Sequence, residues 1–101
     1  MKKTFLLLTL LCTIFIANAA KVDTLDVPSA VMNKAYKAAV VLPKSYTKSK
    51  TNFPVLYLLH GGGGHFRDWL TSTPDKSTVS NLADQYNLII VMPEGETFGW
   101  Y

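Results

Sequence analysis

Two short apolar runs in the second half of the chain predict the interior of a sheet. Residues 55–59 (VLYLL) and 88–92 (LIIVM) are continuously apolar and do not alternate with polar residues. Strands buried on both faces have this pattern, which is typical of a parallel sheet covered by helices. Between the two runs, residues 77–86 carry apolar side chains three and four apart, and Asn87 is an acceptable helix end. The order strand, loop, helix, strand predicts a crossover unit of a parallel sheet.

The first half of the chain predicts an antiparallel hairpin. Residues 25–29 and 35–42 have the composition of short strands, and Pro43 closes the second one. Asn33-Lys34 is a plausible connection between them, so we expect the two strands to pair. The polar, lysine-rich residues 43–52 predict a surface loop.

The N-terminus has the pattern of a secretory signal. Two lysines precede an apolar stretch over residues 5–16, and Ala17-Asn18-Ala19 supplies a small-residue cleavage site. The apolar stretch is too short to span a membrane, although a buried N-terminal helix is an alternative interpretation. We expect residues 1–19 to be removed and residues 20–101 to be secreted or periplasmic. Cys12 could be a lipidation site, but that processing needs a small residue where Leu11 stands.

Charge and cysteine content narrow the classes of partner. The net charge of +3 falls to +1 if Lys2 and Lys3 leave with the signal. The local patch of Lys44, Lys48 and Lys50 is too small to predict nucleic-acid binding. Cys12 is the only cysteine, so a chain that begins at residue 20 would have no disulfide.

The four glycines at positions 61–64 follow the first apolar run and His60. A phosphate-binding P-loop would need Gly-Lys-Ser/Thr after four further residues, and no lysine follows closely. The dinucleotide fingerprint G-x-G-x-x-G fails because Phe66 and Arg67 occupy the last glycine's position in the two possible registers. An oxyanion-hole loop of the His-Gly-Gly-Gly type matches, because bare backbone lets an N–H approach a reacting carbonyl closely. A flexible loop without function is the alternative interpretation.

The stretches FPVLYLLHGGGGHFRDWL and LADQYNLIIVMPEGETFGWY resemble the N-terminal part of the putative esterase family. That family includes esterase D-type S-formylglutathione hydrolases, tributyrin esterases, feruloyl and acetyl-xylan esterases, and mycolyltransferases. The resemblance implies an α/β-hydrolase fold, of which this chain would form the N-terminal part only. It also implies a serine carboxylic-ester hydrolase without cofactor or metal, acting on a small-molecule or carbohydrate-linked ester.

Carried over to this chain, the resemblance assigns one oxyanion N–H to Gly62, with Gly61 and Gly63 shaping the loop. His60 is expected to brace the loop rather than act as a base, and Trp69 is expected to pack under it. Trp100 and Tyr101 are expected to face the substrate cleft, or to be ordinary core aromatics. His65 is interpreted as a loop side chain, since its spacing from His60 matches no familiar metal site.

None of the catalytic triad is present in these residues. The nucleophile motif G-x-S-x-G does not occur, and in α/β-hydrolases the serine, acid and histidine follow this part of the chain. We therefore expect a truncated, inactive fragment of a serine esterase. Two alternatives remain open from the sequence: a non-catalytic carbohydrate-binding or surface protein on a hydrolase scaffold, and an acyltransferase of the same fold. Oligomeric state is not predicted.

Overall fold

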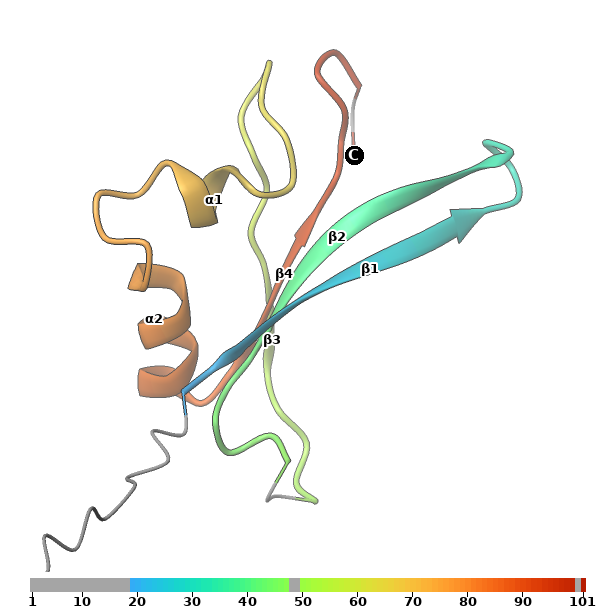
Figure 1. Ribbon diagram of the computed structural model, residues 1–101. Helices are drawn as coiled ribbons and strands as arrows, with labels where there is room; N and C mark the ends of the chain where they lie inside the picture. Colours follow the sequence, from blue (N-terminus) through green and yellow to red (C-terminus); the bar gives the residue numbers. More distant parts are fainter. Residues whose placement is uncertain (1–18, 48–49, 100) are drawn as a thin grey trace, which may run out of the picture.

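The computed structural model describes residues 19–47, 50–99 and 101, which form a mixed sheet with two helices (Figure 1). The strand order is β1-β2-β4-β3, and β3 and β4 are parallel while the other neighbours are antiparallel. Within these residues, no helix is long and apolar enough to cross a membrane. The elements in chain order are β1 (Lys21–Ser29), β2 (Lys34–Leu42), β3 (Val55–Tyr57), α1 (Asp68–Thr71), α2 (Thr78–Tyr86) and β4 (Ile89–Pro93).

The predicted hairpin is confirmed, with different boundaries. β1 and β2 pair antiparallel, and Asn33 adopts φ 48° in the turn between them. Lys34 already belongs to β2, and β1 begins at Lys21 rather than at Leu25. Three of the first four residues of β1 are polar (Lys21, Asp23 and Thr24), so this part of the strand carries a weak apolar signal in the sequence.

The predicted crossover is also confirmed. β3 and β4 are parallel neighbours, and α2 lies between them along the chain. Asn87 ends α2 in the left-handed conformation at φ 52°, which is a common way for a helix to stop. The short helix α1 was not predicted. The core lies between the helices and the sheet, and its buried members are Ala39, Val41, Leu70, Val79, Ala83, Ile90 and Met92.

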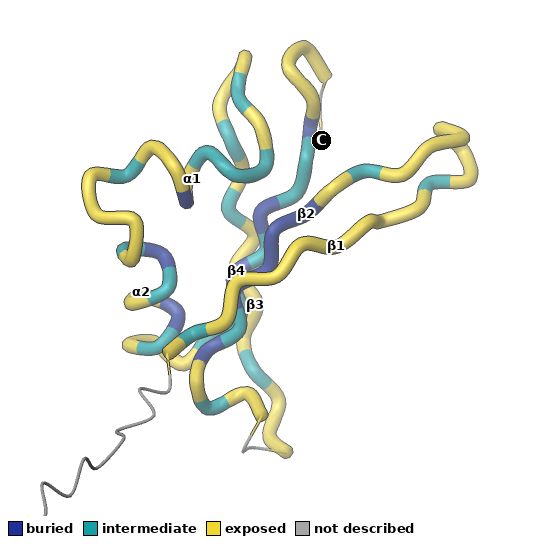
Figure 2. Tube along the Cα trace, in the orientation of Figure 1, coloured by how far each residue is buried: buried dark blue, intermediate teal, exposed yellow. Residues whose placement is uncertain are grey.

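The prediction that both apolar runs are buried on two faces is wrong for β3 in this chain. Val55, Leu56 and Tyr57 are 48%, 45% and 66% exposed, whereas Ile90 in β4 is 2% exposed. The physical reason is position, because β4 lies between β2 and β3 while β3 lies at the edge of the described sheet. Figure 2 shows this contrast between the two strands.

Asp84 on α2 connects three segments of the fold. Its Oδ2 accepts the N–H of Ala20 at 3.1 Å, just before β1, and its Oδ1 accepts the N–H of Lys44 at 2.7 Å, just after β2. A carboxylate that accepts two backbone N–H groups forms strong, charge-assisted hydrogen bonds. These contacts hold the two ends of the hairpin against the helix.

Candidate functional site

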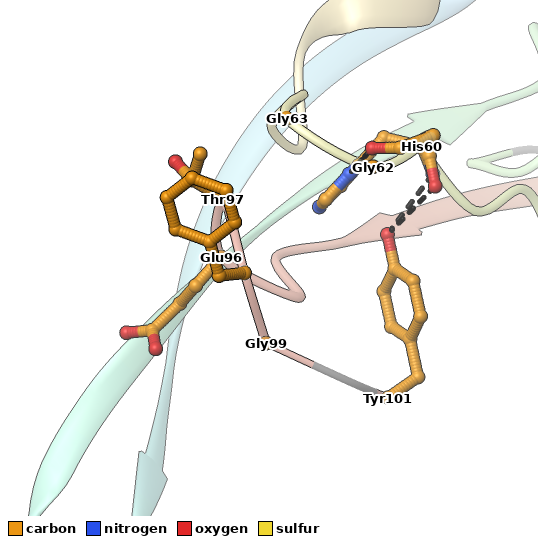
Figure 3. Close-up of a pocket in the computed structure, with 9 residues that line it drawn as sticks. His60, Gly62, Gly63, Glu96, Thr97, Gly99 and Tyr101 are labelled. Carbon is orange, nitrogen blue, oxygen red and sulfur yellow. Dashed lines mark hydrogen bonds between the residues drawn. The ribbon is translucent and has the colours of Figure 1, made fainter.

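Two loops meet at the end of the sheet where the carboxyl ends of the parallel strands β3 and β4 lie. We call residues 60–66, which follow β3, the glycine loop, and residues 94–99 and 101, which follow β4, the β4 loop. Figure 1 shows both at the same end of the sheet. A pocket of about 530 Å³ lies between them, lined from the glycine loop by His60 and Gly61 to Gly63, and from the β4 loop by Glu96 to Gly99 and Tyr101 (Figure 3). Open α/β sheets place ligands at this edge.

Two of the four glycine N–H groups in the glycine loop donate hydrogen bonds to backbone carbonyls of this chain. Gly63 N–H donates to the carbonyl of Thr97 at 3.0 Å, and Gly64 N–H donates to the carbonyl of Gly61 at 3.0 Å. Among the described residues, the N–H groups of Gly61 and Gly62 have no acceptor. Both residues line the pocket, and neither amide is engaged by the part of the chain that the structure describes.

Gly63 is required by its backbone conformation, and Gly64 lies against a side chain. Gly63 has φ +79°, a conformation that costs L-residues energy and glycine little. A Cβ at Gly64 would collide with the carboxylate of Asp68. A Cβ at Gly61 or Gly62 would meet no heavy atom within 4 Å. The four glycines therefore differ in how strongly their local surroundings require glycine.

His60 bridges the two loops through its ring. The side chain is 3% exposed. Its Nδ1 lies 2.8 Å from the carbonyl of Gly61, and its Nε2 accepts the N–H of Gly95 at 3.0 Å. A neutral ring with its proton on Nδ1 satisfies both hydrogen bonds. These contacts are consistent with the predicted role of His60 in bracing the loop. That role stays a prediction, because contacts alone do not show what His60 does in catalysis.

Trp69 and Tyr101 both contact the end of β3. The indole Nε1–H of Trp69, in α1, donates to the carbonyl of Leu59 at 2.9 Å, and the residue is 41% exposed, so its packing under the loop stays a prediction. Tyr101 Oη accepts the N–H of His60 at 3.0 Å, and burial raises the pKa of this phenol above its ordinary value of 10.0. The phenol therefore stays protonated at neutral pH. Trp100 lies outside the described residues.

His65 lies on the outer side of the glycine loop. Its Nε2 is 3.2 Å from Asp68 Oδ1, and its backbone N–H donates to Asp68 Oδ2 at 3.0 Å. The side chain is 57% exposed. These contacts make it a loop side chain, as interpreted from the sequence.

Glu94 is a site residue that the sequence reasoning missed. Its side chain is 18% exposed, its Oε2 accepts the N–H of Phe66 at 3.2 Å, and its Oε1 accepts the N–H of Glu96 at 2.7 Å. The available signal was a carboxylate placed directly after the apolar strand and Pro93. Such a residue stands at the sheet edge where ligands bind, and this position alone could have drawn attention to it.

The comparison with protein families decides the identification. The model of the Putative esterase family matches residues 29–100, which include the glycine loop and all of the β4 loop except Tyr101. This chain belongs to the Putative esterase family. The family assignment made from the glycine loop and the residues around it is therefore confirmed.

The chain is similar to curated and solved proteins that are named esterases. Esterase Rv1288 of Mycobacterium tuberculosis is 44% identical over 62 residues, which are 61% of this chain and 13% of that protein. A solved ferulic acid esterase is 32% identical with a TM-score of 0.64, over 76% of this chain and 32% of the other. The ferulic acid esterase of Anaeromyces mucronatus, solved with ferulic acid, is 28% identical with a TM-score of 0.58, over 76% and 29% of the two chains.

The solved structures confirm the fold class. The S-formylglutathione hydrolase of Staphylococcus aureus, 22% identical with a TM-score of 0.59 over 76% of this chain and 31% of the other, shows the fold alone. The chain forms the N-terminal part of an α/β-hydrolase fold, as predicted. It spans about an eighth of the curated relatives and about a third of the solved structures that it matches.

Proposed function

We propose that this chain supplies the oxyanion-hole region of an exported serine carboxylic-ester hydrolase that acts through an acyl-enzyme. Family membership and the likeness to ferulic acid esterases support the ester substrate. The nucleophile, acid and base would come from sequence outside these 101 residues. The small share of each relative that the chain covers is consistent with this arrangement.

The observation that carries the proposal is the state of the amides in the glycine loop. Gly63 and Gly64 use their N–H groups on Thr97 and on Gly61. Gly61 and Gly62, both on the pocket wall, have N–H groups with no acceptor among the described residues, and the resemblance to the esterase family selects Gly62, the residue after His-Gly, as the donor. An N–H held on a fixed loop and not consumed by the fold is the donor that an oxyanion hole requires.

The proposed reaction has two steps. A serine Oγ would attack the ester carbonyl, and the negative charge that develops on the carbonyl oxygen would be stabilised by Gly62 N–H and a second N–H. Collapse would break the ester bond, with a histidine passing the serine's proton to the departing alkoxide. Water would then attack the acyl-serine with the same donors in place, releasing the acid and restoring the serine.

The pocket favours an ester with an aromatic or carbohydrate-linked part. Phe98 and Tyr101 line it with rings that are 92% and 57% exposed. Exposed aromatic side chains offer flat apolar surface to planar acyl groups and sugar rings. A short-chain p-nitrophenyl ester and methyl ferulate are therefore the two substrates for the assay.

Replacing Gly62 by proline tests the function in the full-length enzyme. Proline removes the proposed donor N–H, and we expect kcat to fall about 10²–10³-fold with a smaller effect on ground-state binding. Gly62→Ala is the matched control, because it keeps the N–H and its Cβ would meet no heavy atom within 4 Å. Melting curves establish that both variants fold.

Two results would contradict this role. A folded Gly62→Pro enzyme with nearly unchanged kcat would show that the loop is not the oxyanion hole. An equal loss in Gly62→Ala would show that the loop conformation, and not the amide, is responsible.

Export is the remaining part of the proposal. Cleavage at the small residues 17–19 would give a mature protein that begins at Ala20 or Lys21. N-terminal sequencing of the protein recovered outside the cytoplasm measures this directly, and an intact Met1 on a cytoplasmic product would contradict it.

A further inference from the structure

Glu94 is the first residue of the β4 loop, and its carboxylate connects that loop to the glycine loop. Its backbone N–H donates to the carbonyl of Lys37 in β2 at 2.9 Å, so its own position is fixed by the sheet. From there its Oε2 reaches Phe66 N–H, at the far end of the glycine loop, at 3.2 Å. Its Oε1 accepts Glu96 N–H at 2.7 Å and so holds the start of the β4 loop.

The hydrogen bonds between the two loops enclose Gly62 from both sides. Before Gly62, the ring of His60 accepts Gly95 N–H and the N–H of His60 donates to Tyr101 Oη. After Gly62, the N–H of Gly63 donates to Thr97 O and the N–H of Phe66 donates to Glu94. The Phe66 contact, at 3.2 Å, is the member of this set whose acceptor is a carboxylate side chain.

Glu94 also faces the ring of His60, and the two would form an ion pair only with a protonated ring. Glu94 Oε1 lies 3.2 Å from His60 Nε2, and that nitrogen already accepts the N–H of Gly95. Both facing atoms are therefore acceptors when the ring is neutral. The two hydrogen bonds from the backbone N–H groups of Phe66 and Glu96 therefore hold the carboxylate of Glu94 in place.

We propose that Glu94 is a positioning residue that sets the geometry of the oxyanion loop. This inference rests on the proposed function, because it concerns the loop that carries Gly62. Glu94 transmits the fixed position of the sheet to Phe66, and so closes the glycine loop at a set distance from the β4 loop. A small displacement of a donor that must sit about 3 Å from the oxyanion reduces kcat more than it reduces substrate binding.

Substitutions at Glu94 in the full-length enzyme test the role. Glutamine keeps the length but only one acceptor oxygen, so its NH₂ group would face one of the two backbone amides. We expect kcat to fall about 10-fold in Glu94→Gln and about 10²-fold in Glu94→Ala, with KM changed less than about 3-fold. The matched control is Asp84→Asn, since Asp84 also accepts two backbone N–H groups but lies on α2, remote from the pocket. It should lower Tm and leave kcat unchanged.

Hydrogen–deuterium exchange gives a second readout that does not depend on activity. The peptide that contains Phe66 should exchange faster in Glu94→Gln than in the wild type, and Asp84→Asn should leave it unchanged. Unchanged exchange in Glu94→Gln would overturn the inference whether or not the enzyme is active on the assayed ester. So would a kcat loss in Asp84→Asn equal to that in Glu94→Gln, because stability alone would then explain the effect.

The outcomes also separate this inference from the proposed function. If Gly62→Pro lowers kcat and Glu94→Gln does not, the loop is the oxyanion hole and Glu94 does not position it. If neither variant changes kcat, the proposed function fails. Loss of activity in both, with faster exchange of the Phe66 peptide, supports the two together.

Discussion

The strands β3 and β4 have similar apolar sequences but different surroundings. β4 has neighbours on both sides, and its residues Ile90 and Met92 are 2% and 1% exposed. β3 pairs only with β4 among the described residues, and each of its three residues is at least 45% exposed. The comparison teaches that an apolar run predicts a strand whose side chains favour burial. Whether they are buried depends on which other segments pack against the strand.

The loops that follow the two strands are more alike than the strands. Both loops lie at the carboxyl ends of the strands, and hydrogen bonds connect each loop to the other. The site thus depends on the relative position of two strands with unequal burial. Perturbing the strands separately tests how far the exposed one is held in place by the buried one.

The largest expected effect is self-association of residues 20–101 expressed alone. The apolar surface and the open edge of β3 offer a template for pairing with another chain. We expect aggregates by size-exclusion chromatography with light scattering, and Tyr57→Lys should reduce them because a charge on an edge strand opposes pairing. A monomeric wild-type chain with a cooperative thermal transition would contradict this prediction.

A smaller effect compares the strands directly in the Tyr57→Lys background. Ile90→Ala should cost about 2–5 kcal/mol of unfolding free energy, because it removes a buried side chain from the core. Leu56→Ala should cost under about 1 kcal/mol, because the side chain is half exposed. Urea unfolding measures both. Equal losses would show that β3 is covered in solution.

The smallest effect concerns Tyr101, through which the β4 loop contacts the end of β3. Burial raises the pKa of its phenol above 10.0, so the neutral form is favoured in the folded state. This contribution to stability is fully present below the unfolded pKa and is lost as pH rises through the raised folded pKa. Unfolding measurements above pH 10 should show a steeper loss in the wild type than in Tyr101→Phe. An equal loss of stability with pH in the two proteins would show that the phenol of Tyr101 does not contribute to the contact between the β4 loop and the residues after β3.

The sequence predicted the elements that have a strong local signal. The helix over residues 77–86, its end at Asn87 and the parallel pairing of the two apolar runs follow from periodicity and turn chemistry. The start of β1 at Lys21 did not, since three of the first four residues of this strand are polar. α1 was missed because four residues are too few for a helical period to show.

The site was predictable where backbone chemistry requires a residue type. The glycine run marks the loop in the sequence itself, because positive φ and close approach both select glycine. Glu94 was not found, because its partners Phe66 and Glu96 are backbone amides that any residue could provide. Contacts of that kind depend on which segments the fold brings together, and the sequence does not record them locally.

The hydrogen bond from Ala20 to Asp84 has a consequence for maturation. If cleavage follows Ala19, the amide nitrogen 3.1 Å from Asp84 Oδ2 becomes the α-ammonium group of the new N-terminus. A neutral donor is then replaced by a cation, and the hydrogen bond becomes an ion pair that anchors the first residue of the mature chain. Cleavage one residue later would remove the donor altogether. The protease's choice between two adjacent alanines would thus decide whether the mature chain begins with an ion pair to α2 or directly with the first residue of β1.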